Sequence, residues 1–190
     1  MLIVGFGHKA RQGKNTAAVG MLSAAPLECH ARIYAYADAL RAEVKQEIKR
    51  FHGYVELLLV HYREHLALPD WVQSEEGKPR TLLQWWGTDY RRAQDPNYWV
   101  KRLQETLDRD NPEIALITDV RFRNEADTIH KMGGFLVKVT RTTKPDVKVP
   151  AHPSEQDLDG YTGWDFTIKA ATIRECHEQA AAIYHKIAGK

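Results

Sequence analysis

The stretch that decides the fold is Leu2-Ile3-Val4-Gly5-Phe6-Gly7-His8-Lys9-Ala10-Arg11-Gln12-Gly13-Lys14-Asn15-Thr16. Its beginning is an apolar run typical of a buried strand. A turn with glycines follows, and then a stretch with a helical pattern. Such a turn points successive backbone N–H groups at one spot, and the helix N-terminus that follows adds positive potential. The stretch therefore predicts a loop that binds the phosphates of a nucleotide.

This loop departs in two ways from the common pattern Gly-x-x-x-x-Gly-Lys-Ser/Thr. Gly7 lies six residues before Gly13, one more than the pattern has, and Asn15 stands where a hydroxyl would hold magnesium. Lys14 keeps the place of the lysine that reaches the outer phosphates. Thr16 offers a hydroxyl one position later, to a more inner phosphate. A plain glycine turn is the alternative interpretation.

Four further short apolar runs predict strands, at residues 33–36, 114–118, 135–139 and 166–168. Between them, apolar residues recur at helical spacing, most clearly over residues 40–51, 99–107 and 173–187. Short buried strands that alternate with helices are typical of a parallel sheet covered on both faces. We therefore expect an α/β fold of three layers, helix–sheet–helix, with a mainly parallel five-stranded sheet.

The length of 190 residues favours one domain over 1–190. Hydrophobic residues make up 43% and charged residues 27%, a balance typical of soluble globular proteins. The sequence has two cysteines, no apolar run near the ~20 residues that span a bilayer, and no basic leader. These features predict a cytoplasmic protein that does not interact with membranes.

The net charge of +2 does not by itself indicate a nucleic-acid-binding protein. Basic residues are nevertheless concentrated in two places, residues 7–16 and 78–102, and a local excess of this kind suits a ligand that carries phosphate. The strand at 114–118 is followed by Asp119, which places a carboxylate at the edge of the sheet where ligands bind in open α/β folds. Such a carboxylate holds Mg²⁺ through water, although a helix cap is the alternative for Asp119.

Taken together, six segments resemble the bacteriophage deoxynucleoside monophosphate kinases. They are Gly13-Lys14-Asn15-Thr16, Tyr36-Ala37-Asp38-Ala39-Leu40-Arg41, Leu83-Gln84-Trp85-Trp86-Gly87-Thr88-Asp89, Asn97-Tyr98-Trp99-Val100, Thr118-Asp119-Val120-Arg121-Phe122-Arg123-Asn124-Glu125 and His152-Pro153-Ser154-Glu155. The resemblance implies a P-loop kinase core like that of adenylate kinase, a helical acceptor-binding region at about 52–110 and a lid-like segment at about 141–156. It also implies transfer of the terminal phosphoryl group of ATP, with Mg²⁺, to a deoxynucleoside 5'-monophosphate.

The resemblance also implies roles for individual residues. The expected catalytic residues are Lys14, Asp38, Arg121 and Arg141, and Asp119 is expected to hold Mg²⁺ through water. The residues expected to bind the phosphates of ATP are Lys9, Ala10, Arg11, Gln12, Gly13, Lys14, Asn15 and Thr16. Those expected to bind the acceptor are Asp38, Arg41, Trp85, Asp89, Arg92, Trp99, Arg121 and Glu155. Core packing is the alternative for each tryptophan, and a helix cap is the alternative for Glu125. Asp is common in the family where this chain has Asn15, which leaves the source of the Mg²⁺ contact open.

Other functions stay open at this point. Some related phage kinases act on a hydroxymethyl pyrimidine such as 5-hydroxymethyluracil in DNA, and the basic, tryptophan-containing stretch 78–102 fits a strand-binding face as well as a nucleotide pocket. The near-neutral net charge argues against DNA as the acceptor. Dephospho-coenzyme A kinase has a similar core. Related kinases are often homodimers, but no stripe of residues in this chain identifies an interface.

Two alternatives lie outside phosphoryl transfer. His61-Tyr62-Arg63-Glu64-His65 spells H-x-x-E-H, a zinc-peptidase signature in which two histidines at i and i+4 bind zinc and the glutamate is the base. Such peptidases need a third ligand and a larger scaffold, which the sequence does not offer. A nucleotide sensor without catalysis is the other alternative, against which the many acceptor-side residues argue.

Overall fold

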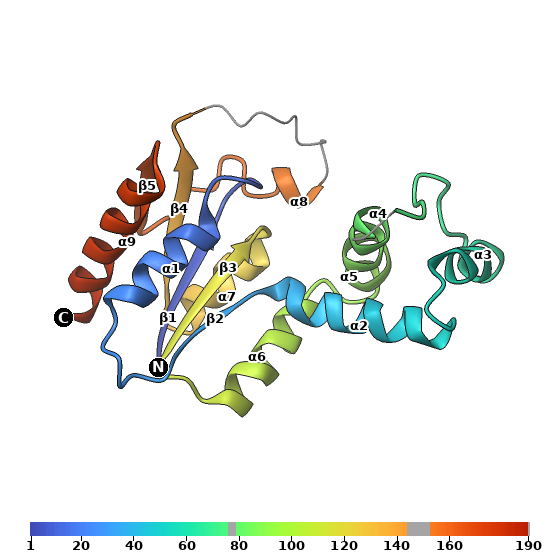
Figure 1. The fold of residues 1–190 in the computed structure, drawn as a ribbon, viewed down its shortest axis with the longest axis horizontal. Helices are drawn as coiled ribbons and strands as arrows, with labels where there is room; N and C mark the ends of the chain where they lie inside the picture. The colour runs from blue at the N-terminus through green and yellow to red at the C-terminus, as the bar shows by residue number, and fades with distance from the viewer. Residues whose placement is uncertain (76–78, 144–152, 190) are drawn as a thin grey trace. The chain divides into compact units, whose positions relative to one another are not determined.

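The computed structural model describes residues 1–75, 79–143 and 153–189. The chain divides into two compact units (Figure 1). One consists of Met1–Tyr36 and Leu103–Lys190, and we call it the sheet unit. The other consists of Ala37–Arg102, and we call it the helical unit.

The sheet unit is built on five strands, β1 (Leu2–Gly7), β2 (Ala31–Tyr34), β3 (Ile114–Val120), β4 (Phe135–Arg141) and β5 (Phe166–Ala170). They are arranged in the order β2-β3-β1-β4-β5, and every neighbouring pair is parallel. The predicted α/β fold with a parallel five-stranded sheet is thereby confirmed. The second strand lies two residues earlier than expected, because Tyr36 already opens a helix and donates its N–H to the Asp119 carboxylate over 2.7 Å.

Helices cover both faces of this sheet. On one face lie α1 (Lys14–Ala24) and α9 (Ile173–Ala188), whose buried residues share a core with Val4 and Phe6 of β1. On the other face lies α7 (Arg123–Lys131), since a Cβ added to Gly5 would meet the Ile129 side chain. The helices α1 and α9 pack closely at Gly20, where a Cβ would lie 2.6 Å from the Cα of His177. A short helix, α8 (Pro153–Gln156), precedes β5.

The helical unit contains α2 (Tyr36–Arg50), which begins one residue inside the sheet unit, α3 (Val55–Leu66), α4 (Arg80–Gln84), α5 (Arg91–Gln94) and the start of α6 (Tyr98–Asp110). Between α4 and α5 the chain forms a π-helical turn, η1 (Trp85–Tyr90), which no sequence pattern predicted. The buried side chains of the helical unit include Leu58, Leu82, Trp85, Trp86 and Trp99. No helix within the described parts of the chain is long and apolar enough to cross a membrane.

Candidate active site

The loop between β1 and α1 has an unusual backbone. His8, Arg11 and Gly13 have φ values of 92°, 59° and 93°, in the region that favours glycine. His8 lies five residues before Gly13, so His8, not Gly7, occupies the first glycine position of the phosphate-loop pattern. Gly7 instead belongs to β1, where a Cβ would lie 2.5 Å from the Trp164 ring. The extra residue counted in the sequence therefore belongs to the strand, and the loop has the usual length.

Lys14 is the first residue of α1 and is only 7% exposed. Its Nζ donates hydrogen bonds to the carbonyl oxygens of His8 at 3.0 Å and Lys9 at 2.6 Å, so the ammonium group lies inside the curve of the loop. The pKa of Lys14 falls from 10.5 to about 7, mainly through burial and then through the positive charge of Arg121, while Asp119 acts in the opposite direction. Lys14, Arg121 and Asp119 therefore share one electrostatic environment.

Asp119 and Arg121 lie at the carboxyl end of β3 and just beyond it. One oxygen of Asp119 accepts the Tyr36 N–H. Glu125 is 2% exposed, and its Oε2 accepts the backbone N–H groups of Arg121 at 2.8 Å and Phe122 at 3.1 Å. Glu125 therefore caps α7, which confirms the helix cap given above as the alternative for this residue. The same carboxylate holds the backbone that carries Arg121.

Glu155, on α8, meets the loop and Arg121 at once. Its Oε2 accepts the Ala10 N–H over 2.6 Å, and its Oε1 pairs with the Arg121 guanidinium. The side chain is 11% exposed. The family resemblance implies that Glu155 binds the acceptor, and no sequence pattern indicates its contact with the phosphate loop, which lies 145 residues away in the chain.

The other predicted loop residues differ in their surroundings. Lys9, Arg11 and Asn15 are exposed, and Lys9 pairs with Asp159 over 3.2 Å. Gln12 accepts the backbone N–H of Arg141 over 2.8 Å, which links the loop to the end of β4.

Arg141 is itself exposed, and its Nε donates to the Thr143 hydroxyl over 2.7 Å. Residues 144–152 of the predicted lid-like segment, with His152, lie outside the described residues.

Six residues predicted to bind the acceptor belong to the helical unit. Asp38 and Arg41 form an ion pair of 3.0 Å on α2, and Asp89 is exposed on η1. Arg92 donates to the carbonyl oxygen of Pro96 over 3.0 Å. Trp85 and Trp99 are 5% and 3% exposed, and the Trp99 Nε1–H donates to the Gly87 carbonyl over 2.8 Å. Both tryptophans thus contribute to the core of this unit, and their contact with an acceptor stays a prediction.

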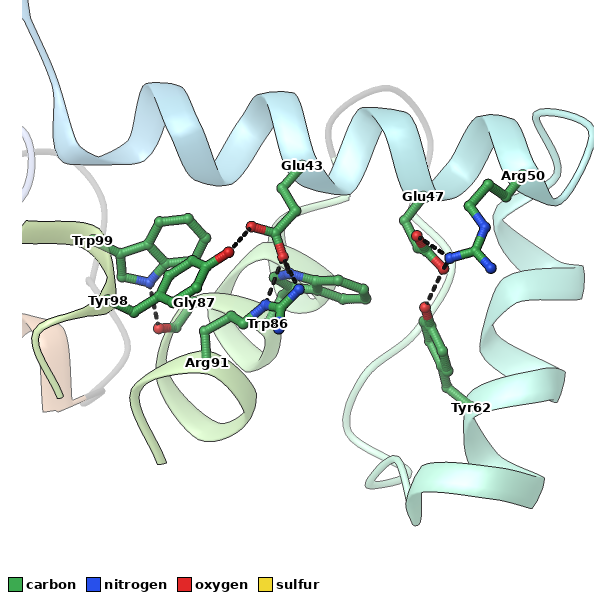
Figure 2. A network of polar contacts seen from close by, with 9 residues as sticks. All are labelled: Glu43, Glu47, Arg50, Tyr62, Trp86, Gly87, Arg91, Tyr98 and Trp99. Carbon is green, nitrogen blue, oxygen red and sulfur yellow. Dashed lines mark hydrogen bonds and ion pairs between the residues drawn. The ribbon is translucent and has the colours of Figure 1, made fainter. Parts of the chain in front are cut away.

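A polar network around Glu43 holds the helical unit together (Figure 2). The Glu43 carboxylate on α2 accepts hydrogen bonds from Trp86 Nε1 at 3.0 Å, Arg91 Nε at 2.5 Å and Tyr98 OH at 2.9 Å. The Arg91 guanidinium also lies about 5 Å from the ring centres of Tyr90 and Tyr98. Arg91 is therefore a structural residue of this unit, and no pattern in the sequence indicates the role of Glu43.

The H-x-x-E-H segment lies on α3. The His61 and His65 rings stack with their centres 4.3 Å apart, and His65 Nδ1 lies 2.8 Å from the His61 carbonyl oxygen. Among the described residues, no group of three or more His, Cys, Asp and Glu side chains could hold a metal ion. This part of the chain gives no support to a zinc peptidase.

These features define a class of protein. A parallel sheet, a loop of backbone N–H groups that leads into a helix, a buried lysine at the start of that helix and an aspartate on the neighbouring strand are typical of a P-loop kinase core. The chain belongs to the deoxynucleotide monophosphate kinase family, whose profile matches residues 57–175. That match begins after the phosphate loop, so the loop and the family are independent observations.

Two relatives are similar to parts of the chain. A protein of Acanthamoeba polyphaga mimivirus, named provisionally as a deoxynucleotide monophosphate kinase, is 33% identical over 115 residues, which cover 53% of this chain and 58% of that protein. The deoxynucleoside-5'-monophosphate kinase of Escherichia phage T5 is 33% identical over 86 residues, which cover 42% of this chain and 34% of the phage protein. The chain thus covers less than two thirds of either relative.

Proposed function

We propose that this protein transfers the terminal phosphoryl group of ATP, with Mg²⁺, to a deoxynucleoside 5'-monophosphate and so forms the diphosphate. One observation carries the proposal: the buried Lys14 lies in the curve of the loop, within the electrostatic reach of Arg121 and Asp119. Phosphoryl transfer needs alignment and positive charge more than covalent chemistry, and this arrangement can supply both.

Each residue has a distinct part in the proposed reaction. The N–H groups of the loop and Lys14 bind the outer phosphates of ATP, and a phosphate next to Lys14 keeps its ammonium group protonated. Arg121, fixed through Glu125, stabilises the charge that spreads over the transferred group. Arg141 adds positive charge from the end of β4. Asp38 either accepts a hydrogen bond from the acceptor or orients Arg41, and its ion pair with Arg41 supports the second role.

Asp119 suits the magnesium ion that such a reaction needs. Mg²⁺ prefers oxygen ligands and usually keeps several waters, so one carboxylate beside the phosphates is enough to position it. The Tyr36 N–H holds one oxygen of Asp119 and orients the carboxylate. When bound, the ion would neutralise phosphate charge in the transition state.

The acceptor is proposed from the names of the family and of the two relatives. The test is transfer of labelled phosphate from ATP to a panel of dAMP, dGMP, dCMP, dTMP, 5-hydroxymethyl-dUMP, dephospho-coenzyme A, and DNA with and without 5-hydroxymethyluracil. We expect label on at least one free monophosphate and none on DNA. Label on DNA alone would contradict the acceptor proposed here, and no label on any member of the panel would contradict the kinase activity.

The same assay tests Lys14. The Lys14→Ala variant is expected to lose more than about 3 kcal/mol of transition-state stabilisation, because it removes a charge aimed at the transferred phosphate. Lys131→Ala, at an exposed position in the last turn of α7, is the matched control and is expected to keep its rate. Equal rates in Lys14→Ala and the control would contradict the phosphate-loop interpretation.

A further inference from the structure

The phosphate loop already binds an anion, and this anion belongs to the chain itself. The Glu155 carboxylate accepts the Ala10 N–H over 2.6 Å with one oxygen and pairs with Arg121 through the other. A loop N–H and an arginine are the groups that bind phosphoryl oxygens in phosphate sites. The carboxylate therefore satisfies, within one side chain, two of the donors that the proposed function assigns to a nucleotide.

Glu155 and a bound nucleotide cannot share these donors. The Glu155 side chain is 11% exposed, so little water screens its charge from that of a neighbouring phosphate. The Ala10 N–H is a single donor. A phosphate oxygen can accept this hydrogen bond only after the Glu155 carboxylate has released it. Binding of ATP to the loop thus requires Glu155 to move.

The segment that carries Glu155 is attached to the same part of the sheet unit by two further acidic residues. Asp157 accepts the backbone N–H of Arg123 over 2.7 Å, and its own carbonyl oxygen accepts the Arg123 Nε–H over 3.0 Å. Asp159 pairs with Lys9, on the loop, over 3.2 Å. Glu155, Asp157 and Asp159 therefore each contact a basic residue of the sheet unit. Within the described structure, only Glu155 among these three carboxylates contacts a loop N–H.

We propose that Glu155 is an internal competitor of the nucleotide, an inference that rests on the proposed function. The Glu155 side chain occupies the phosphate site in the empty protein and withdraws when phosphates bind. Two consequences follow. The apparent Kd for ATP is the intrinsic Kd divided by the fraction of molecules in which Glu155 is not bound to the loop, so ATP binds more weakly than it would without Glu155. Arg121 becomes available to the transferred phosphate only when Glu155 has released it, so binding of the nucleotide also completes the site.

The test measures the binding of ATP and of inorganic pyrophosphate by calorimetry, with Mg²⁺, to the full chain and to its Glu155→Gln variant. The amide keeps the shape of the side chain and removes the charge that competes with phosphate. We expect both ligands to bind about tenfold more tightly to Glu155→Gln. The matched control is Asp157→Asn, which removes a charge from the same segment without touching the loop, and its affinities are expected to stay within about twofold of those of the unmodified protein.

A second readout does not depend on the nucleotide. The amide resonance of Ala10 in an NMR spectrum is expected to lie downfield in the empty protein, because a charged acceptor binds it, and to move upfield in Glu155→Gln. This spectrum also shows whether the variant is folded.

The outcomes separate the inference from the proposed function. Tighter binding in Glu155→Gln alone supports the inference. Unchanged or weaker binding, or equal tightening in Asp157→Asn, overturns it and leaves the kinase proposal in place. Absence of binding in all three folded proteins overturns the proposed function and the inference with it.

Discussion

Lys14 is a charged side chain in a buried position, and the loop around it determines what that costs. The two carbonyl oxygens of His8 and Lys9 satisfy two of its three donors. They do not restore the hydration that burial removes, and Arg121 adds repulsion, so the pKa falls to about 7. A residue in this state is poorly stabilised in the empty protein and well placed to gain from an incoming anion.

The lowered pKa of Lys14 predicts a pH dependence of the free energy of unfolding. Between about pH 7 and 10.5 the unfolded chain holds a proton that the folded chain has released, so stability rises with pH across this window. Below pH 7 the cost of the buried charge is fully present. We expect Lys14→Met to be more stable than the unmodified protein by a few kcal/mol at pH 6.5, since one pKa unit corresponds to about 1.4 kcal/mol, and to lose most of this advantage at pH 9.5. Urea unfolding at the two pH values measures the difference, and an advantage equal at both would contradict the pKa assigned to Lys14.

Gly13 tests the backbone of the loop. Its φ of 93° lies where a residue with a Cβ is strained, although a Cβ there would meet no atom closer than 4.0 Å. We expect Gly13→Ala to lower the free energy of unfolding by about 1–2 kcal/mol and to weaken ATP binding, because the loop N–H groups change direction. Gly133→Ala, at φ 74° with open space around it, is the matched control at the end of α7. It is expected to lose similar stability with no change in ATP affinity; a loss of affinity in both variants would refute the local explanation.

At the scale of single elements, the π-helical turn η1 depends on its packing against α2. A Cβ at Gly87 would lie 2.9 Å from the Leu40 side chain, so the glycine lets the turn approach α2. Glu43, one turn further along α2, accepts hydrogen bonds from Trp86 and Arg91 at the two ends of the turn (Figure 2). A π-helical turn is unfavourable alone and often marks a functional site. Here it carries Trp85 and Asp89, both predicted to bind the acceptor.

Glu43→Gln tests this element. The amide removes the charge that Arg91 faces and presents N–H groups to side chains that are themselves donors. Because the Glu43 side chain is 21% exposed, we expect a loss of about 2 kcal/mol in the free energy of unfolding, measured by urea denaturation. Glu178→Gln makes the same chemical change at a 63% exposed ion pair with Arg174 and is expected to cost less than about 0.5 kcal/mol. Equal losses in the two variants would show that the network does not stabilise η1.

At the scale of the whole molecule, the chain consists of two compact units, and a destabilising change in one is expected to act mainly on that one. Glu43→Gln should lower hydrogen-exchange protection within Ala37–Arg102. Gly20→Ala, which forces α1 against His177 of α9, should lower it within the sheet unit. Exchange measured by mass spectrometry on both variants provides the comparison, and a uniform loss of protection over the chain in both would contradict the expected independence.

The order of the strands and of the longest helices along the chain follows from local sequence patterns. The runs Leu2–Phe6 and Ile114–Ile117 contain no polar side chain, and strands of that kind are typical of a parallel sheet covered on both faces. Lys14 was identifiable because a strand, a glycine turn and a helix are adjacent in the chain, and the physical requirements of a phosphate loop are local. These predictions needed no knowledge of contacts between distant residues.

Other features of the site and of the helical unit depend on contacts between residues that are far apart in the chain. His8 takes the conformation of a glycine because the fold around β1 and α1 fixes the length of the loop, while its own preference is for negative φ. Trp85 and Trp99 are buried in the helical unit, which their residue type left open. Glu155 reaches the Ala10 N–H across 145 residues, and Glu43 joins groups on three elements. Local propensity acts over a few residues, whereas these contacts arise only after the sheet and helices have brought distant parts of the chain together.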